Sequence, residues 1–510
     1  MEMNRTRFAE KNIIFGYAGT LVTAVMGFIL KQVFIARLGD TLNGVNGLYT
    51  GVLSMLNVAE LGIGTALNFA LYGPVARKET EKIKSYMRFY RRAYYFIALA
   101  VTAAGLALLP FLQYFVRNPG PVSLFDLRAY YLIFLFNTAS SYLVSYKYSL
   151  VNAEQKNYIQ SNIFSLTKLV SSAVQLAVIL FTESFYAFLL ADAAVQLLQK
   201  VFVSIYLNRR YPYLKDRDAR PLSPEEHSMI WSKTRALLWL KLGDVARLQT
   251  DSIIISSFIA VEVSGLVDNY NMVINSVGSF AHIIFNSVVS GFGNLVATES
   301  REKQMEMFGV YRFFAAWVYG FIAVGFFALL TPFVGSLWLT PAHMLPGLSI
   351  NLILADFYLR GERIVLANFK TAAGVFEPDK YLPAVQGVVN LIISVFLVIR
   401  IGLPGVYVGT VVSGILANIF KPWVIYRNCF GKSPAGYYAG TVKYAAVNLA
   451  LALLVKLTVS PLVRNMGWMK FAAAVILAAL IYNGAFIALF ARTKEFREIY
   501  VRVLDRLKRK

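Results

Sequence analysis

The chain has 510 residues, of which 57% are hydrophobic and 15% charged, and its mean hydropathy is +0.56. Soluble globular proteins are typically about 45–50% apolar and about 25% charged, so this composition excludes most soluble folds and predicts a polytopic membrane protein. The net charge of +22 is first explained by basic loops that set membrane topology and contact anionic lipid, and we expect no nucleic-acid partner. A single cysteine, Cys429, excludes an internal disulfide, and three scattered histidines form no metal-site spacing.

Apolar stretches of about 20 residues or more, long enough to span a bilayer, recur along the chain. We expect fourteen spanning helices, and we read the first as an uncleaved span rather than a signal peptide. The fold class is therefore expected to be an all-α polytopic membrane protein. In chain order the spans cover residues 12–36, 43–73, 93–115, 129–151, 158–181, 185–207, 234–259, 265–297, 313–333, 347–374, 382–399, 403–426, 438–460 and 470–491.

Fourteen spans place both termini on the same side of the membrane. The ends and loops of that side hold 36 Lys and Arg residues, whereas the loops of the opposite side hold seven. Because Lys and Arg accumulate in cytoplasmic loops, we predict that both termini are cytoplasmic.

The two halves of the chain repeat with an offset of 221 residues and no gaps. Gly44 aligns with Gly265, and Tyr49 aligns with Tyr270. The offset carries the first span onto the seventh in the same orientation, which is typical of a parallel repeat. We therefore expect two six-helix bundles around a central cleft. The expected parts are an N-terminal bundle (1–207), a basic cytoplasmic linker (208–233), a C-terminal bundle (234–427), two extra helices (438–491) and a basic cytoplasmic tail (492–510).

Thirteen charged residues fall inside the expected spans. Each would cost about 2.5–3.5 kcal/mol at the centre of a spanning helix, so we expect these residues to line a wet cavity or to pair inside the protein. The bases are Lys31, Lys168, Lys200, Lys241, Arg247, Arg360 and Arg363, and the acids are Glu60, Asp192, Asp244, Asp251, Asp356 and Glu362.

Two groups of these charges share a helix face. Lys241, Asp244, Arg247 and Asp251 lie within an arc of about 120°, and Asp356, Arg360, Arg363 and Lys370 lie within about 80°, with Glu362 off that face. Two interpretations stay open. The pairs Asp244–Arg247 and Asp356–Arg360 are either local ion pairs or part of a cationic lining whose acids titrate or bind an ion. Lys200 is expected to snorkel to the membrane surface, and His282 to be a hydrogen-bonded packing residue.

Three stretches carry a family resemblance. In residues 44–94, Glu60 is followed by Leu-Gly-Ile-Gly, then by LYGPVA and a basic amphipathic segment. Residues 251–308 contain GNLVATESREK, and residues 357–438 contain GERIVLANFKTAAGVFEPDKYLPAVQG. Over most of residues 10–440 the chain resembles bacterial oligosaccharide flippases of the polysaccharide transporter family, in the multidrug/oligosaccharidyl-lipid/polysaccharide exporter superfamily.

The resemblance implies two bundles facing a cleft that opens alternately to either side of the bacterial cytoplasmic membrane. It implies a short oligosaccharide on undecaprenyl diphosphate as substrate, moved outward for surface polysaccharide. We expect membrane lipids and glycan-assembly proteins such as a polymerase as partners, a monomer, and no cofactor beyond a coupling H⁺ or Na⁺. The family pattern falls on Glu60, Asp251, Asn269, Tyr270, Arg363, Lys370 and Asp379, whereas Val267 and Asp268 depart from it.

The chemistry of such a substrate suggests roles for the buried charges. A diphosphate favours cations, and Arg can bind phosphate bidentately whereas Lys acts as a point charge. We expect the diphosphate to be held by Arg247, Arg360 and Arg363, helped by Lys31, Lys168 and Lys241. The candidate ion-coupling residues are Glu60, Asp244, Asp251, Asp192 and Asp356. Tyr142, Tyr270 and Tyr358 are candidates for stacking on sugars, although packing is the expected role of any single aromatic residue.

Three alternatives remain. A multidrug or cation antiporter of the same fold predicts a cavity dominated by acids, whereas six acids here meet seven bases. A membrane glycan polymerase or ligase would present carboxylates or histidines in a sizeable outer loop, and the Asp-x-Asp sequence at Asp216–Asp218 lies instead in the basic linker. A scaffold without transport activity would gain nothing from the cost of intramembrane charges.

Overall fold

The structure, a computed structural model, describes residues 2–215, 219–287, 289–375, 377–463 and 467–508. Contacts divide the chain into two compact units, Met1–Gly265 and Leu266–Lys510. Throughout the described ranges the regular elements are helices. The first unit contains α1 (Glu2–Leu56), α2 (Val58–Arg77), α3 (Thr80–Leu108), η1 (Leu109–Phe111), α4 (Leu112–Phe115), α5 (Leu124–Ser145), α6 (Tyr148–Ala153), α7 (Asn157–Thr182), α8 (Phe185–Arg210), η2 (Pro212–Lys215), α9 (Pro224–Leu248), α10 (Thr250–Phe258) and the start of α11 (Val261–Asn286).

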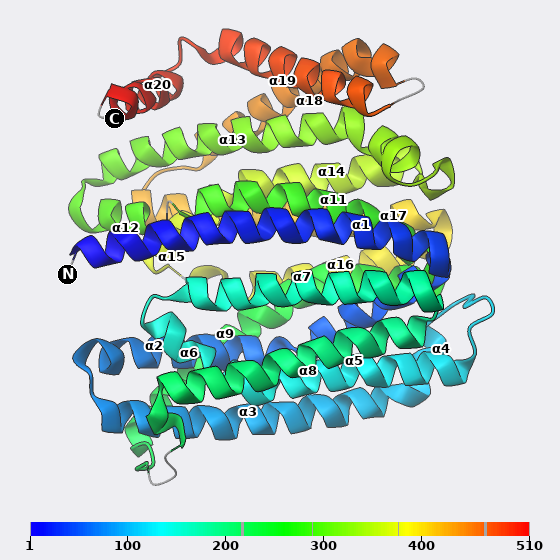
Figure 1. The fold of residues 1–510 in the computed structure, drawn as a ribbon. Coiled ribbons are helices and arrows are strands. Elements are labelled where there is room, and N and C mark those ends of the chain that lie inside the picture. The colour runs from blue at the N-terminus through cyan, green and yellow to red at the C-terminus, as the bar shows by residue number, and fades with distance from the viewer. Residues whose placement is uncertain (1, 216–218, 288, 376, 464–466, 509–510) are drawn as a thin grey trace. The chain divides into compact units, whose positions relative to one another are not determined.

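The second unit contains the rest of α11 and the helices that follow it, together with the two extra helices and a tail helix. They are α12 (Val289–Thr298), α13 (Arg301–Pro332), η3 (Phe333–Trp338), η4 (Pro341–His343), α14 (Gly347–Glu362), α15 (Ile364–Ala373), η5 (Glu377–Asp379), α16 (Leu382–Ile401), α17 (Leu403–Ile425), η6 (Tyr426–Phe430), α18 (Ala435–Val463), α19 (Trp468–Phe490) and α20 (Lys494–Lys508). Figure 1 shows α3, α5 and α8 side by side in the first unit, and α13 with α18 and α19 in the second.

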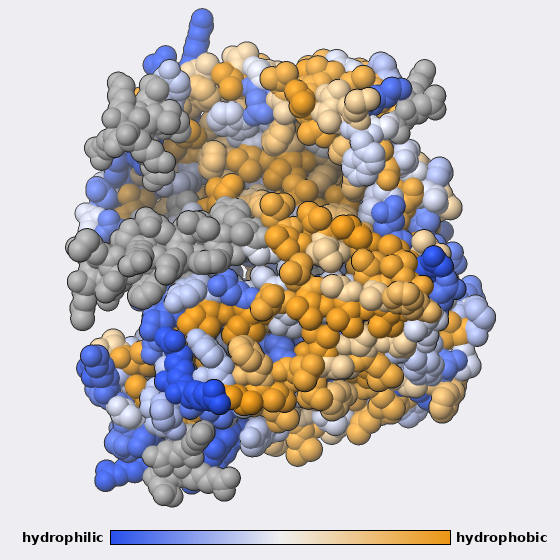
Figure 2. All heavy atoms as spheres, in the orientation of Figure 1, coloured by the Kyte–Doolittle hydropathy of each residue, from blue (hydrophilic) through white to orange (hydrophobic). Residues whose placement is uncertain are grey.

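Ten helices of the described residues are long and apolar enough to cross a membrane. The other predicted spans are also helical, but each consists of two shorter helical segments, as in α5 with α6 and α14 with α15. Figure 2 shows hydrophobic side chains over the middle of the long helices and hydrophilic side chains near their ends. The protein is an all-α, multi-pass membrane protein, as its composition predicts.

The repeat is visible where the first span passes into the second. α1 is interrupted at Gly39, whose φ of 82° and ψ of 172° are favourable only for glycine. The equivalent position in the second half is Ala260, and α10 ends at Phe258 just before α11 begins at Val261. Both halves therefore break the chain at the same position of the repeat.

Two equivalent tyrosines also make equivalent contacts. Tyr49 is fully buried and its hydroxyl group donates to the carbonyl oxygen of Leu127, 2.9 Å away, in the first turn of α5. Tyr270 is fully buried as well, and its hydroxyl group accepts from the backbone N–H of Leu345 at 3.3 Å, just before α14. Each tyrosine thus fixes a long helix to the start of another helix in its own unit.

The equivalent glycines meet in the first unit. A Cβ atom on Gly44 would lie 1.9 Å from the carbonyl oxygen of Val261, and one on Gly265 would lie 2.8 Å from the backbone nitrogen of Gly44. The side-chain amide of Asn43 donates to the carbonyl oxygen of Gly265 at 3.0 Å. Glycine at both positions therefore allows backbones to approach closely, as is common between membrane helices.

Contacts between loops agree with the predicted sides of the membrane. On the side poor in basic residues, Arg37 forms an ion pair with Glu183, at the far end of α7. On the basic side, Lys82 lies 3.1 Å from Glu226 in the first unit, and Lys494 lies 2.7 Å from Glu306 in the second. Each pair joins segments that the charge pattern places together.

The two extra helices are an integral part of the second unit. α18 and α19 pack on α13 around a cluster of aromatic and aliphatic side chains. The hydroxyl group of Tyr482 donates to Asn448 at 2.8 Å, and the indole N–H of Trp317 donates to Asn483 at 2.9 Å. Helix association in lipid depends on such packing and hydrogen bonds, so α18 and α19 are held firmly on α13.

Candidate functional site

The charged residues of the expected spans concentrate where helices are interrupted. Glu60 lies in the first turn of α2, just after the break at Asn57. Arg247 and Asp251 flank Gln249, where α9 ends and α10 begins, and Arg363 joins α14 to α15. An interrupted helix frees backbone polar groups, which is tolerated at membrane depth only inside protein or beside a wet cavity. Each unit therefore has its own candidate functional site at these breaks, at α1/α2 and α9/α10 in the first unit and at α14/α15 in the second.

Glu60 in the first unit lies among tyrosines. Its carboxyl group lies beside the hydroxyl group of Tyr94, whose ring is 6.4 Å from that of Tyr142. The hydroxyl group of Tyr142 donates to the side chain of Asn57 at the break. Because Tyr142 is 1% exposed, packing rather than sugar stacking is its role in this structure.

The break between α9 and α10 holds a second pair of expected residues. Arg247 is buried and Asp251 is half-buried, so both are shielded at membrane depth. The side chains of Lys241 and Asp244 lie outside the residues that the structure describes, so their predicted roles and the pair Asp244–Arg247 stay predictions.

In the second unit, Asp356 and Arg360 form the local ion pair that was one of the two interpretations. Arg360 Nε lies 2.8 Å from Asp356 Oδ2, and the aspartate is buried whereas the arginine side chain is 39% exposed. The exposed part of the guanidinium group can still donate to a ligand. The ion pair is therefore confirmed, and the expected phosphate contact of Arg360 stays compatible with it.

Arg363 is fixed to the neighbouring helix α17. Its side chain is buried, and Nη1 donates to the carbonyl oxygen of Gly414 at 2.5 Å. Nearby, Lys370 forms an ion pair with the buried Asp379 of η5. Two basic residues of the family pattern thus stabilise the helix break and the turn that follows it.

A buried ion pair that the sequence did not predict lies at the same break. Arg312 Nη2 is 3.0 Å from Oε1 of Glu362, which is fully buried, and Thr441 on α18 donates to the same oxygen at 2.6 Å. The guanidinium group also stacks on the ring of Tyr437, 3.5 Å from its centroid. Arg312 precedes the expected span 313–333, and Glu362 lies off the charged face of its helix, so helical spacing gives no signal for this pair.

The remaining expected charges are separate from the breaks. Lys31 is half-buried on α1, Lys168 is exposed on α7, and Asp192 on α8 accepts a hydrogen bond from Ser171. The expectation that Lys200 snorkels is wrong. Its side chain is buried, and Nζ donates to the carbonyl oxygen of Asn137 at 2.9 Å, because α5 offers oxygen atoms inside the bundle.

His282 and the tyrosines Tyr270 and Tyr358, the other two candidates for stacking on sugars, make local contacts. His282 hydrogen-bonds to Asn286 at 2.7 Å on the same helix, but it is exposed rather than packed. Tyr270 is fully buried, and the hydroxyl group of Tyr358 accepts from Asn448 at 3.2 Å. These tyrosines contribute to packing, as expected.

The fold has clear relatives among solved structures. No protein-family model matches the sequence, and no curated protein matches it. The structure is similar to one titled "Lipid II flippase MurJ, inward closed conformation", with a TM-score of 0.67 and 13% identity over 94% of this chain and 99% of that chain. It is also similar to an inward-facing multidrug resistance MATE family transporter of the MOP superfamily, with a TM-score of 0.65 and 14% identity over 81% and 97%.

A third similar structure is a MOP superfamily transporter from Pyrococcus furiosus whose title reports a binding pocket of reverse polarity. Its TM-score is 0.56, with 15% identity over 84% of this chain and 97% of that chain. The chain has the fold of the MOP-superfamily transporters. The expected superfamily fold is thereby confirmed, whereas membership of the polysaccharide transporter family stays a prediction.

Proposed function

We propose that the protein is a flippase that moves undecaprenyl-diphosphate-linked oligosaccharides from the inner to the outer leaflet of the bacterial cytoplasmic membrane. It acts without covalent chemistry, by alternating access, with both termini in the cytoplasm. The observation that carries the proposal is the burial of Arg247 and Arg363 at two helix breaks of a fold shared with a lipid II flippase.

The physical argument concerns the diphosphate. Moving it across a bilayer requires cations in a protected environment, and broken helices provide free backbone groups beside those cations. Arg360, Lys31, Lys168 and Lys241 are the further candidate contacts. The acids Glu60, Asp192, Asp244 and Asp251 are candidates for coupling the movement to a H⁺ or Na⁺ gradient. Asp356, the fifth acid expected from the sequence, is in an ion pair with Arg360, and we do not propose it for coupling.

The second candidate function is drug or cation export, because several similar structures are multidrug transporters. The coverage favours the flippase. The MATE transporter aligns with 81% of this chain, whereas the lipid II flippase aligns with 94%. The larger aligned share is long enough to include the extra helices α18 and α19. We expect the glycan-assembly polymerase to be a partner and the flippase itself to be a monomer.

The phosphate assignment is tested by neutral substitutions at the breaks. We expect Arg247→Gln and Arg363→Gln each to reduce flipping of a lipid-linked oligosaccharide by about tenfold or more, because a bidentate charged contact is lost. Arg400→Gln is the matched control, since Arg400 is exposed at the end of α16. If both variants fold and transport like the parent protein, the arginines do not hold the diphosphate.

A further inference from the structure

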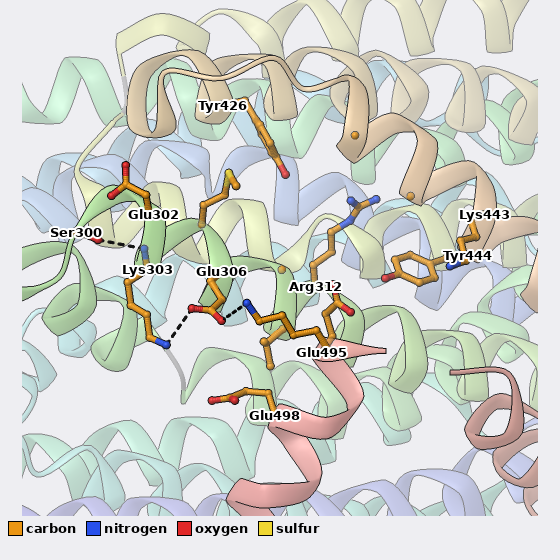
Figure 3. A pocket seen from close by; sticks show the side chains of 16 residues that line it. Ser300, Glu302, Lys303, Glu306, Arg312, Tyr426, Lys443, Tyr444, Glu495 and Glu498 are labelled. Atoms are coloured by element: carbon orange, nitrogen blue, oxygen red, sulfur yellow. Dashed lines mark hydrogen bonds and ion pairs between the residues drawn. The ribbon is translucent and has the colours of Figure 1, made fainter. Parts of the chain in front are cut away.

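A polar cavity of about 790 Å³ lies in the second unit, where the first turns of α13 and α18 meet α20. Figure 3 shows the side chains that line it. α13 contributes Lys303 and Arg312, α18 contributes Gly436 and Lys443, and α20 contributes Lys494. The cavity is distinct from the helix breaks that form the candidate transport site.

The segments that build the cavity are basic when taken together, whereas the cavity lining itself holds four basic and four acidic residues. Residues 298–312, 421–443 and 492–510 hold 15 Lys and Arg residues against six Asp and Glu residues. All three segments are predicted on the basic side of the membrane. Such segments attract the phosphate groups of anionic lipids.

The tail helix α20 has the character of a helix at a membrane surface. Phe496 packs on Trp317, with ring centroids 5.8 Å apart, while Tyr500 and Val501 are exposed. Helices with one apolar and one charged face lie in the interfacial region of a bilayer. The cavity that α20 borders is therefore expected at the level of lipid headgroups.

Arg312 places a buried guanidinium group, paired with Glu362, at the wall of the cavity. Its side chain is more than nine-tenths buried, and its Nε has no hydrogen-bond partner among the described residues. A Cβ atom on Gly440 would lie 2.8 Å from Nη1 of Arg312, so glycine there gives the guanidinium group room. A Cβ atom on Gly436 would meet open space, because Gly436 borders the cavity.

The acidic residues of the lining limit the kind of ligand. Glu306 is bound between Lys303, at 3.0 Å, and Lys494, at 2.7 Å, and the carboxylate raises the pKa of Lys494. Glu302, Glu495 and Glu498 also border the cavity. A headgroup that carries hydroxyl groups as well as a phosphate suits this lining, because hydroxyl groups donate to carboxylates while the phosphate faces the cations.

We propose that this cavity binds the headgroup of an anionic phospholipid of the phosphatidylglycerol type. Its phosphate faces Lys443 and Arg312, and its glycerol hydroxyl groups face Glu495. The acyl chains lie along the apolar side of α18, where Val442 is 69% exposed and Leu449 is 62% exposed. Arg312 also pairs with Glu362, which precedes Arg363, so this arginine links the cavity wall to the helix break. The proposal does not depend on the transported substrate.

The test uses the purified full chain in detergent with short-chain phosphatidylglycerol, short-chain phosphatidylcholine or inorganic phosphate. A ligand that binds the folded state raises the unfolding temperature. We expect phosphatidylglycerol to raise it and phosphatidylcholine not to do so. We expect Lys443→Gln to raise the half-saturating phosphatidylglycerol concentration about fivefold, because one cation near the phosphate is lost.

Lys456→Gln is the matched control. Lys456 is exposed on the same helix, beside the ring of Phe327, but it lies away from the cavity. Gly436→Phe, which fills the cavity, is expected to abolish the lipid-induced rise in unfolding temperature. Without lipid, this variant is expected to unfold at the same temperature as the parent protein. An equal shift with phosphatidylcholine, or an unchanged half-saturation in Lys443→Gln, would overturn the proposal. The same shift with inorganic phosphate alone would assign the cavity to free phosphate instead of lipid.

Native mass spectrometry gives a second measurement for each variant. We expect one tightly held phosphatidylglycerol molecule on the parent protein and on Lys456→Gln, and a lower occupancy on Lys443→Gln at the same lipid concentration. These measurements need no transport assay, so a negative result would not count against the proposed flippase function. A failure of the transport assay would likewise not count against the lipid site.

Discussion

The break at Glu60 in the first unit and the break at Arg363 in the second differ in how charge is compensated. Glu60 has tyrosine hydroxyl groups beside it, which are neutral at ordinary pH. Around Arg363, the charges Asp356–Arg360 and Arg312–Glu362 are matched in ion pairs. Among the side chains that the structure describes, the carboxyl group at the first break has neutral partners, whereas the charges at the second break are already paired. A carboxyl group with neutral partners can gain or lose a proton without breaking an ion pair.

The largest expected effect comes from breaking the buried ion pair of the second unit. Arg312→Ala leaves the fully buried Glu362 without its cation, and we expect a loss of about 3–5 kcal/mol in the free energy of unfolding. The double variant Arg312→Met/Glu362→Leu should recover most of that loss. Thermal and denaturant unfolding of the purified protein measure both. A single variant as stable as the parent would show that the second break does not depend on this pair.

The next effect concerns transport. Under the proposed function, Glu60→Gln should weaken the dependence of flipping on an ion gradient about tenfold, the usual size of a coupling between sites. Asp356→Asn, which alters an acid that is already paired, should lower flipping without changing its gradient dependence. Flux measured with and without an imposed gradient separates the two. The comparison fails if Asp356→Asn uncouples transport and Glu60→Gln does not.

A packing change in the first unit is expected to be smaller. Gly44→Ala places a methyl group against the backbone of Val261, and we expect a cost of about 1–3 kcal/mol from overpacking. Gly484→Ala is the control, because no atom lies within 4 Å of its added Cβ. If the unfolding temperature fell equally in both variants, the close contact between the backbones at Gly44 and Val261 would be contradicted.

The smallest effect belongs to the pair between the exposed Lys494 and the half-buried Glu306. The carboxylate raises the pKa of Lys494, so the pair stabilises the folded state below the ordinary lysine pKa of about 10.4 and loses that contribution as pH rises through the raised pKa. The difference in unfolding temperature between the parent and Lys494→Gln should be small at pH 7 and should vanish above that pKa. A difference that grows with pH would show the opposite sign of linkage.

Much of the fold follows from the sequence. A single sequence displays the local composition that sets the span lengths and the repeat that matches Tyr49 with Tyr270. It also displays the loop charges that place Lys82 and Glu226 on the same side of the membrane. The interruptions at Asn57 and Arg363 were not predicted, because helical hydrophobicity continues across both positions.

The partners of buried charges were harder to predict than the charges themselves. Lys200 meets Asn137 of α5, and Glu362 meets Arg312 of α13, 50 residues away in the sequence. Helical spacing reports which residues share a face of one helix, but it does not report which other helix lies against that face. Of the intramembrane ion pairs that the described side chains form, the pair within one helix, Asp356–Arg360, was accessible to that reasoning.

The central claim is tested most directly in sealed proteoliposomes that contain the parent protein and an undecaprenyl-diphosphate-linked oligosaccharide with a labelled sugar. The accessibility of the label from outside is followed with and without a H⁺ or Na⁺ gradient, and a cationic dye serves as the competing substrate. We predict protein-dependent movement of the lipid-linked sugar, accelerated by one of the gradients. Dye export without movement of any lipid-linked sugar, or new covalent glycan products in place of movement, would contradict the account.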